Sequence, residues 1–454
     1  MEKIQKMGLL TGIPVINFHA AGIDVGSMLM TVSFTDTFGN QCLYETNGFT
    51  KDLKALVALL QEQGVKDVAM EATGVYWMSL YELLEDSGIK VTLINPSHYK
   101  NSANQKTDIN DCIWIHQYHS CGILRHSHIA PDLYRELRHY IHERTVIQVQ
   151  KSDTLNRMHR LLTLMNIKFQ HLISDIEGAG GMKLLRAIAC GITDPQELLS
   201  YINVDRFKAV REELLDSLNG IYKEQFVTLL QMKLEEYDFF VHRMKKYEVL
   251  IEGVLKKMPD FYSREEEAAV SAQKKKQGVK YVRKNQYGID VKSHLKRITG
   301  IDLTQVEGFD EKMLLDIISV TGTDMSKWPT GQHFVSYLKL SPRKKISGGK
   351  QLGHDRSKTS NPATQAFRLA ARSLAGSKGN WGVLYRRLSV KKGAKTANKA
   401  VARKLAVLFY VLVKNHQPYD KNKVIEQEQK RQEREIARFK KTAHRLGYTV
   451  QKVA

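Results

Sequence analysis

The sequence GIDVG at residues 22–26 predicts the first strand of a mixed sheet, and the pattern that follows it decides the fold class. In residues 30–34, Met30, Val32 and Phe34 alternate with polar residues, which is typical of a half-buried strand. Further strands and helices follow in the order strand (41–46), helix (51–64), strand (65–71), helix (75–88) and strand (89–96). Three strands, helix, strand, helix, strand is the order of a sheet with helices packed against it.

The remainder of the chain is helical in pattern and divides into further regions. Residues 107–235 carry apolar stripes at helical spacing, typical of packed helices or a coiled-coil arm, whereas residues 260–293 are charged and unpatterned, which favours a solvated linker. We therefore predict an α/β plus α protein with four regions: a mixed α/β domain (20–150), a helical, coiled-coil arm with a charged insertion (151–300), a mainly helical domain (301–420) and a charged helical tail (421–454).

Composition narrows the class of partner. Lys and Arg number 69 against 48 Asp and Glu, and the resulting net charge of +21 favours a polyanion, above all nucleic acid. No segment approaches the roughly 18 uninterrupted apolar residues of a membrane span, so we expect no membrane insertion. The four cysteines show neither metal-ligand spacing nor a disulfide framework, and with no signal peptide evident we expect a cytoplasmic protein.

Four carboxylates are placed where they could hold a metal ion. Asp24 lies in a short apolar strand, Glu71 ends another, and Asp108 and Asp111 lie three residues apart on a predicted helix, about 60° apart around its axis. If the two strands are neighbours, both of their acids emerge at one edge of the sheet. Mg²⁺ or Mn²⁺ prefers such oxygen ligands, and two ions can assist phosphodiester cleavage. Singly, each acid is better explained as a turn or helix-start residue; together, on this strand order, they favour metal binding.

The strand order and the acids in GIDVG, MEATGVYW and KTDINDCIW resemble the RuvC-like (RNase H-like) nuclease fold of DEDD-type insertion-sequence transposases of the one-ten class, which are bridge-RNA-guided recombinases. The resemblance continues through INPSHYKNSANQKTDINDC and covers about residues 22–165 and 300–420. It implies that Asp24, Glu71, Asp108 and Asp111 are the family's metal-binding, catalytic carboxylates.

The resemblance also implies a nucleophile, Ser347, in the segment LKLSPRKKISGGKQLGHDRSKTSNPATQAFRLAARSL. In such a mechanism the serine meets the four-acid centre, plausibly of another protomer, and forms a phosphoserine link with DNA. From the residues alone, Ser-Gly-Gly indicates only a turn. The neighbouring cations would position a phosphate backbone or simply stay in water; they are Arg343, Lys344, Lys345 and Lys350.

Two departures from the family pattern stand out. Val306-Glu307-Gly308-Phe309 replaces the usual Pro-Gly-Ile-Gly hairpin, and the middle region, about 190–295, is longer than the usual arm. The first departure puts a hairpin-type DNA contact there in doubt.

Three functions remain open. The first is a transposase or recombinase that joins donor and target double-stranded DNA, guided by a structured RNA and acting as a homodimer or tetramer. The second is a RuvC-like structure-selective endonuclease or junction resolvase that uses metal-activated water. The third is a non-enzymatic nucleic-acid scaffold in which the acids are structural.

Overall fold

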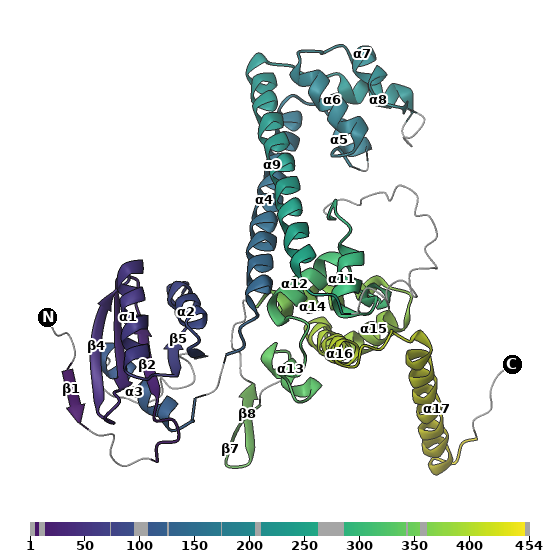
Figure 1. The fold of residues 1–454 in the computed structure, drawn as a ribbon. Coiled ribbons are helices and arrows are strands. Elements are labelled where there is room, and N and C mark those ends of the chain that lie inside the picture. Colours follow the sequence, from purple (N-terminus) through teal and green to yellow (C-terminus); the bar gives the residue numbers. More distant parts are fainter. Residues whose placement is uncertain are drawn as a thin grey trace. The chain divides into compact units, whose positions relative to one another are not determined.

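The computed structural model describes residues 5–8, 14–72, 74–94, 108–124, 127–173, 175–204, 210–261, 286–341, 344–354 and 361–449. The chain forms two compact units, residues 1–129 and 130–454. The first is a mixed α/β unit and the second is mainly helical, which confirms the predicted fold class (Figure 1).

A six-stranded sheet forms the centre of the first unit (Figure 1). Its strands are β1 (Gln5–Gly8), β2 (Ala20–Val25), β3 (Leu29–Thr35), β4 (Gln41–Asn47), β5 (Asp67–Glu71) and β6 (Lys90–Ile94), in the spatial order β1-β4-β3-β2-β5-β6. All five predicted strands are present. Sequence reasoning missed β1, because QKMG is too short to show a periodic pattern. Strands β2, β5 and β6 are parallel, and β3 and β4 join by antiparallel pairing.

One face of this sheet is apolar. Because side chains alternate between faces, Ile23, Val32 and Met70 all point to the side covered by α1 (Thr50–Glu62) and α2 (Trp77–Asp86). Leu56 and Leu80 of these helices are fully buried in the same cluster. Helix and strand periodicity therefore agree on a single core.

The opposite face carries α3 (Asp108–Ser120) and combines polar residues with a small apolar cluster of Ala69, Ile94 and Ile115. The backbone of α3 lies directly on Gly22. A Cβ atom at this position would lie 2.2 Å from the backbone nitrogen of His116 and 2.7 Å from the backbone oxygen of Cys112. The His116 ring is within hydrogen-bonding distance of two hydroxyls, with Nδ1 2.9 Å from Ser33 and Nε2 3.1 Å from Thr35. Burial lowers the pKa of His116 to about 3, so the ring stays neutral at pH 7.

A second polar contact attaches the other end of α3. His119 Nε2 lies 2.9 Å from Asp67, whose carboxylate also accepts from Lys90 at 2.5 Å and from Thr92 at 3.3 Å. Burial alone would raise the pKa of Asp67, but the hydrogen bonds with His119 and Lys90 lower it below its ordinary value. The helix is thus held on the sheet at one close backbone contact and two polar ones.

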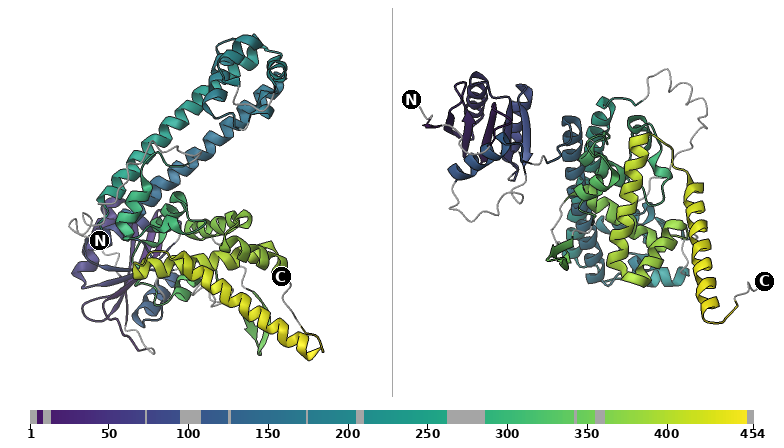
Figure 2. Two further views of the ribbon diagram at one scale, coloured as in Figure 1. Left: turned by 90° about the vertical axis from the view of Figure 1, so that its right-hand side faces the viewer. Right: turned by 90° about the horizontal axis from the view of Figure 1, so that it is seen from below.

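In the second unit, two long antiparallel helices form the predicted arm (Figures 1 and 2). They are α4 (Asp132–Leu164) and α9 (Glu224–Lys257). At one end, Leu155 of α4 packs with Leu234 of α9 in a core shared with four short helices: α5 (Phe169–Leu172), α6 (Ala179–Ala189), α7 (Pro195–Ser200) and α8 (Arg211–Leu218). The boundary predicted at residue 150 falls inside α4.

A buried ion pair joins the two long helices near their other end. Arg144 Nη2 donates to Glu248 at 2.6 Å, and the guanidinium lies 4.0 Å from the centre of the Tyr287 ring. Glu248 also accepts from the Gly288 backbone at 3.0 Å. Most of the predicted solvated linker lies outside the described residues, but its end does not stay in water, because Tyr287 is buried in this junction.

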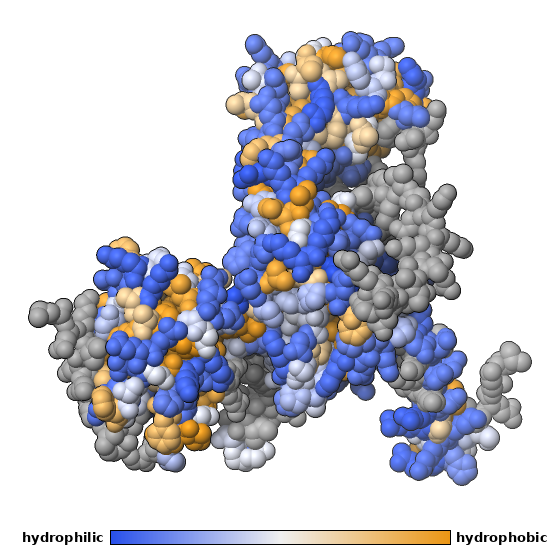
Figure 3. All heavy atoms as spheres, in the orientation of Figure 1, coloured by the Kyte–Doolittle hydropathy of each residue, from blue (hydrophilic) through white to orange (hydrophobic). Residues whose placement is uncertain are grey.

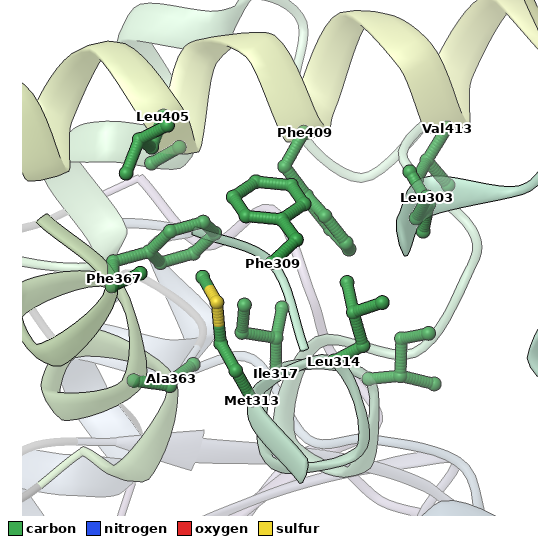
Figure 4. Packing of buried hydrophobic residues seen from close by; sticks show 14 of the residues in the cluster. Leu303, Phe309, Met313, Leu314, Ile317, Ala363, Phe367, Leu405, Phe409 and Val413 are labelled. Atoms are coloured by element: carbon green, nitrogen blue, oxygen red, sulfur yellow. The ribbon is translucent and has the colours of Figure 1, made fainter. Parts of the chain in front are cut away.

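The C-terminal core is built around aromatic rings (Figure 4). Phe367 packs against Phe309 and Phe409 at ring-centre distances of 6.2 and 5.8 Å. Phe309 ends the Val306-Glu307-Gly308-Phe309 segment and is buried, so this residue serves the core. The helices here are α11 (Val291–Thr299), η3 (Leu303–Gln305), α12 (Glu311–Thr321), α13 (Gly331–Tyr337), α14 (Pro362–Ser373), η4 (Leu374–Gly376), α15 (Asn380–Lys392) and α16 (Ala394–Asn415).

The predicted charged tail forms α17 (Lys421–Arg445), whose visible surface is mainly hydrophilic (Figure 3). Across the described segments, no helix combines the length and the apolar character that crossing a bilayer requires. None of the four cysteines, all in described segments, forms a disulfide.

Replacing Gly22 by Ala should destabilise the first unit, because the new methyl group meets backbone atoms that cannot turn aside. Overpacking of this kind costs about 1–3 kcal/mol. Thermal unfolding measures the change. The matched control is Gly253→Ala in α9, where nothing lies within 4 Å of the added carbon and alanine favours the helix. Equal melting temperatures for Gly22→Ala and the wild type would contradict the close contact.

Candidate functional site

The two strand acids lie on neighbouring strands. Strands β2 and β5 pair in parallel up to Ile23 and Met70, and Asp24 and Glu71 are the next residue on each strand. Gly22 and Ala69, two residues earlier, face α3, so both acids point to that same face of the sheet. Glu71 is buried and Asp24 is half-buried. The condition for bringing these acids together, that their strands be adjacent, is met.

Helix α3 carries the other two acids over the same face. Asp108 is its first residue and is exposed, and Asp111 follows almost one turn later and is half-buried. Gly22 contacts the Cys112 and His116 backbone, which places the first turn of the helix beside the end of β2. The close packing at Gly22 therefore determines where Asp111 lies.

The pKa of the Cys112 thiol depends on its burial and on the acids around it. The pKa of this thiol is raised to about 12, mainly by burial and in smaller part by the negative charges of Asp24, Asp111 and Glu45. Asp24 of the strand and Asp111 of the helix thus both raise the pKa of the same buried thiol. The thiol remains protonated at pH 7, so it is not a thiolate ligand in this state.

Glu45 is an acid that sequence reasoning missed. Asp24 pairs with Thr31 on β3, and Thr31 pairs with Glu45 on β4, so the three side chains share one face of the sheet. The pattern of β4 indicated a strand, but the pairing that puts Glu45 in line with Asp24 depends on cross-strand register, which the local sequence does not carry. Glu45 is exposed.

The donor chemistry of these acids suits a hard divalent cation, since all are carboxylate oxygens. Their positions are not those of a closed cage: within the described ranges, no three His, Cys, Asp or Glu side chains are grouped closely enough to hold a metal ion. Residues 95–107, which lead into Asp108, lie outside those ranges. The structure thus brings Asp24 beside Glu71 and places Asp111 near Asp24, without gathering all four acids around one point.

Ser347 lies in the second unit, at the tip of a two-stranded hairpin (Figure 1). It ends β7 (Lys344–Ser347) and pairs with Lys350, the first residue of β8 (Lys350–His354). Gly348 and Gly349 between them have φ values of 53° and 74°, which is typical of the tight turn that joins antiparallel strands. The turn indicated by Ser-Gly-Gly is therefore the turn of a hairpin, and Gly-Gly between two short strands was the signal that could have revealed the hairpin.

The hairpin exposes Ser347 and Lys350 side by side. The Ser347 hydroxyl and the Lys350 ammonium group could bind one phosphate together, because both side chains are exposed at the hairpin tip. Lys344 and Lys345 lie in β7, whereas the predicted contact at Arg343 lies outside the described residues.

Comparisons with known proteins match both units. A family model for the DEDD transposase of the IS110 class, described as a transposase, matches residues 21–167. A second model, described as the transposase IS116/IS110/IS902 family, matches residues 302–385, and together the two matches span about half of the chain. No curated protein matches the chain. The first match contains the strand and helix acids and the second contains the serine hairpin, so the chain belongs to the IS110-class transposases.

Proposed function

We propose that this transposase cleaves and rejoins DNA strands through a covalent serine–DNA intermediate, assisted by Mg²⁺ or Mn²⁺ at Asp24, Glu71, Asp108 and Asp111. The observation that carries the proposal is the parallel pairing of β2 with β5, which sets Asp24 and Glu71 side by side at the ends of two strands. Acids at such an edge, beside a helix with two more, are the ligands that phosphodiester chemistry needs.

In the first step, the Ser347 hydroxyl oxygen attacks a backbone phosphorus. A phosphorus–oxygen bond to the sugar breaks, the serine proton is lost to a base, and the released strand end takes up a proton to become a hydroxyl. In the second step, a hydroxyl of a new strand loses its proton and bonds to the phosphorus, the bond between phosphorus and the serine oxygen breaks, and that oxygen takes up a proton to restore the serine hydroxyl. A bound divalent ion would supply positive charge to the phosphate oxygens. Lys350 holds the phosphate beside Ser347.

Carboxamide variants test the metal ligands. Asp24→Asn and Glu71→Gln should each lower the DNA cleavage rate by roughly a thousandfold, because they remove about 4 kcal/mol of transition-state stabilisation. Chelation with EDTA should have the same effect. Added Mn²⁺ should also raise the melting temperature of the wild type and leave that of the variants unchanged.

The matched control is Glu82→Gln, an exposed acid on α2, across the sheet from α3. It changes the net charge equally and should cleave at the wild-type rate. Wild-type cleavage by Asp24→Asn and Glu71→Gln would contradict the metal-ligand role and would mean that the acids are structural.

Ser347→Ala separates the transposase mechanism from that of a junction resolvase. We expect loss of both strand cleavage and protein-linked DNA, detected by denaturing electrophoresis of the protein with labelled DNA. Ser326→Ala, which alters another exposed serine of the same unit, is the control and should retain both. Cleavage at the wild-type rate by Ser347→Ala would mean that water is the nucleophile, as in the resolvase.

We also propose that a structured RNA guides the choice of donor and target DNA, and that the chain works as a homodimer or tetramer. The net charge of +21 suits a large polyanionic partner. The acids and Ser347 belong to different compact units, which would allow one protomer to supply the serine to the acids of another.

Purification of the full chain from cells that carry its element tests both statements. We expect a defined RNA to co-purify, and light scattering with RNA and DNA to give the mass of a dimer or tetramer. A monomeric complex would contradict the shared site, and an RNA-free complex that still selects its target would contradict the guide.

A further inference from the structure

The positive charge of the chain is concentrated in one segment. Residues 361–419, all described, hold 12 Lys and Arg and no Asp or Glu. This segment therefore carries more than half of the net charge of +21. It comprises α14, η4, α15 and α16, of which α16 lies beyond the matched family segment, residues 302–385.

Several of these cations form hydrogen bonds within the second unit. Arg386 donates to the backbone oxygens of Ala375 and Ser377 at 3.0 and 2.6 Å. Arg403 donates to Gln332 at 2.6 Å, and Lys414 donates to the Tyr410 hydroxyl at 2.8 Å. These three side chains therefore already have hydrogen-bond acceptors within the unit.

Four lysines at the turn between α15 and α16 have no such role. These turn lysines are Lys391, Lys392, Lys395 and Lys399, and all four are exposed. Helix α15 ends at Lys392 and α16 begins at Ala394, so the single residue Gly393, with φ of 79°, brings the two helix ends together. Lys395 and Lys399 lie four residues apart, on one face of α16.

The turn lysines have no acidic partner among the described residues. Within the part of the chain that the structure describes, no carboxylate forms an ion pair with any of them. Like charges four residues apart on a helix destabilise it by a few tenths of a kcal/mol. An anionic partner bound to these lysines would offset their mutual repulsion.

We infer that the turn lysines bind the phosphate backbone of duplex DNA without reading its sequence. Duplex DNA is the partner because the chain is a transposase, and because lysine is a point charge that suits a phosphate and carries no sequence information. The turn lysines lie on other elements than the four acids and the Ser347 hairpin. Since the inference rests on family membership and charge, it stands or falls independently of the metal and serine proposals.

The double variant Lys395→Gln and Lys399→Gln tests the surface in the full chain. Affinity for a duplex of unrelated sequence is measured by fluorescence anisotropy between about 50 and 200 mM salt. Loss of two phosphate contacts should make the salt-induced fall in affinity about tenfold smaller than in the wild type. A second double variant, Lys391→Gln and Lys392→Gln, should behave in the same way.

The matched control is Lys256→Gln with Lys257→Gln on α9, which removes the same charge. These two lysines are ion-paired, with Glu252 at 3.0 Å and Glu136 at 3.7 Å, so the control should keep the wild-type salt dependence. Thermal unfolding checks that every variant is folded.

Three results would overturn the inference. In the first, both double variants keep the wild-type salt dependence for duplex DNA. In the second, only binding to structured RNA or to anionic phospholipid vesicles weakens. In the third, the control pair weakens duplex binding as much as the turn lysines do, which would mean that net charge alone matters.

Discussion

The close approach of α3 to β2 is the constraint on which the first unit depends. With no side chain, Gly22 lets the backbone of the helix rest on the strand, and any Cβ there would stand 2.2 Å from a backbone nitrogen. The contact therefore fixes the distance between the α3 backbone and the sheet. Because Asp24 follows two residues after Gly22 and Asp111 directly precedes Cys112, the same contact sets the separation of a strand acid from a helix acid.

Polar contacts then determine where α3 lies along the sheet. Apolar packing is tolerant of small slides, whereas a buried hydrogen bond is lost when its partners move, at a cost of about 1–3 kcal/mol. His116 between two hydroxyls and His119 on Asp67 are such contacts, one near the middle of the helix and one near its end. In this unit, hydrogen bonds under α3 determine the position of that helix, and the apolar face under α1 and α2 contributes stability to the fold.

In the second unit, aromatic packing and one buried ion pair have these two roles. Aromatic packing of Phe309, Phe367 and Phe409 supplies the core, and the buried Arg144–Glu248 pair joins the long helices where they enter it. A buried pair of this kind adds specificity of arrangement more than stability. Residues 361–419 contain no Asp or Glu, so this segment carries only positive charge, which suits a partner made of phosphates.

The sequence alone determined the order of strands and helices, the strands that carry Asp24 and Glu71, and the excess of positive charge, because periodicity and composition are properties of neighbouring residues. Only the tertiary structure decided that β2 and β5 are adjacent, that Glu45 lies in line with Asp24, that β1 joins the sheet and that Ser347 is at a hairpin tip. These depend on register and on contacts such as Ser33 with His116, 83 residues apart. No local pattern encodes such a contact, since its energy exists only once the chain has folded.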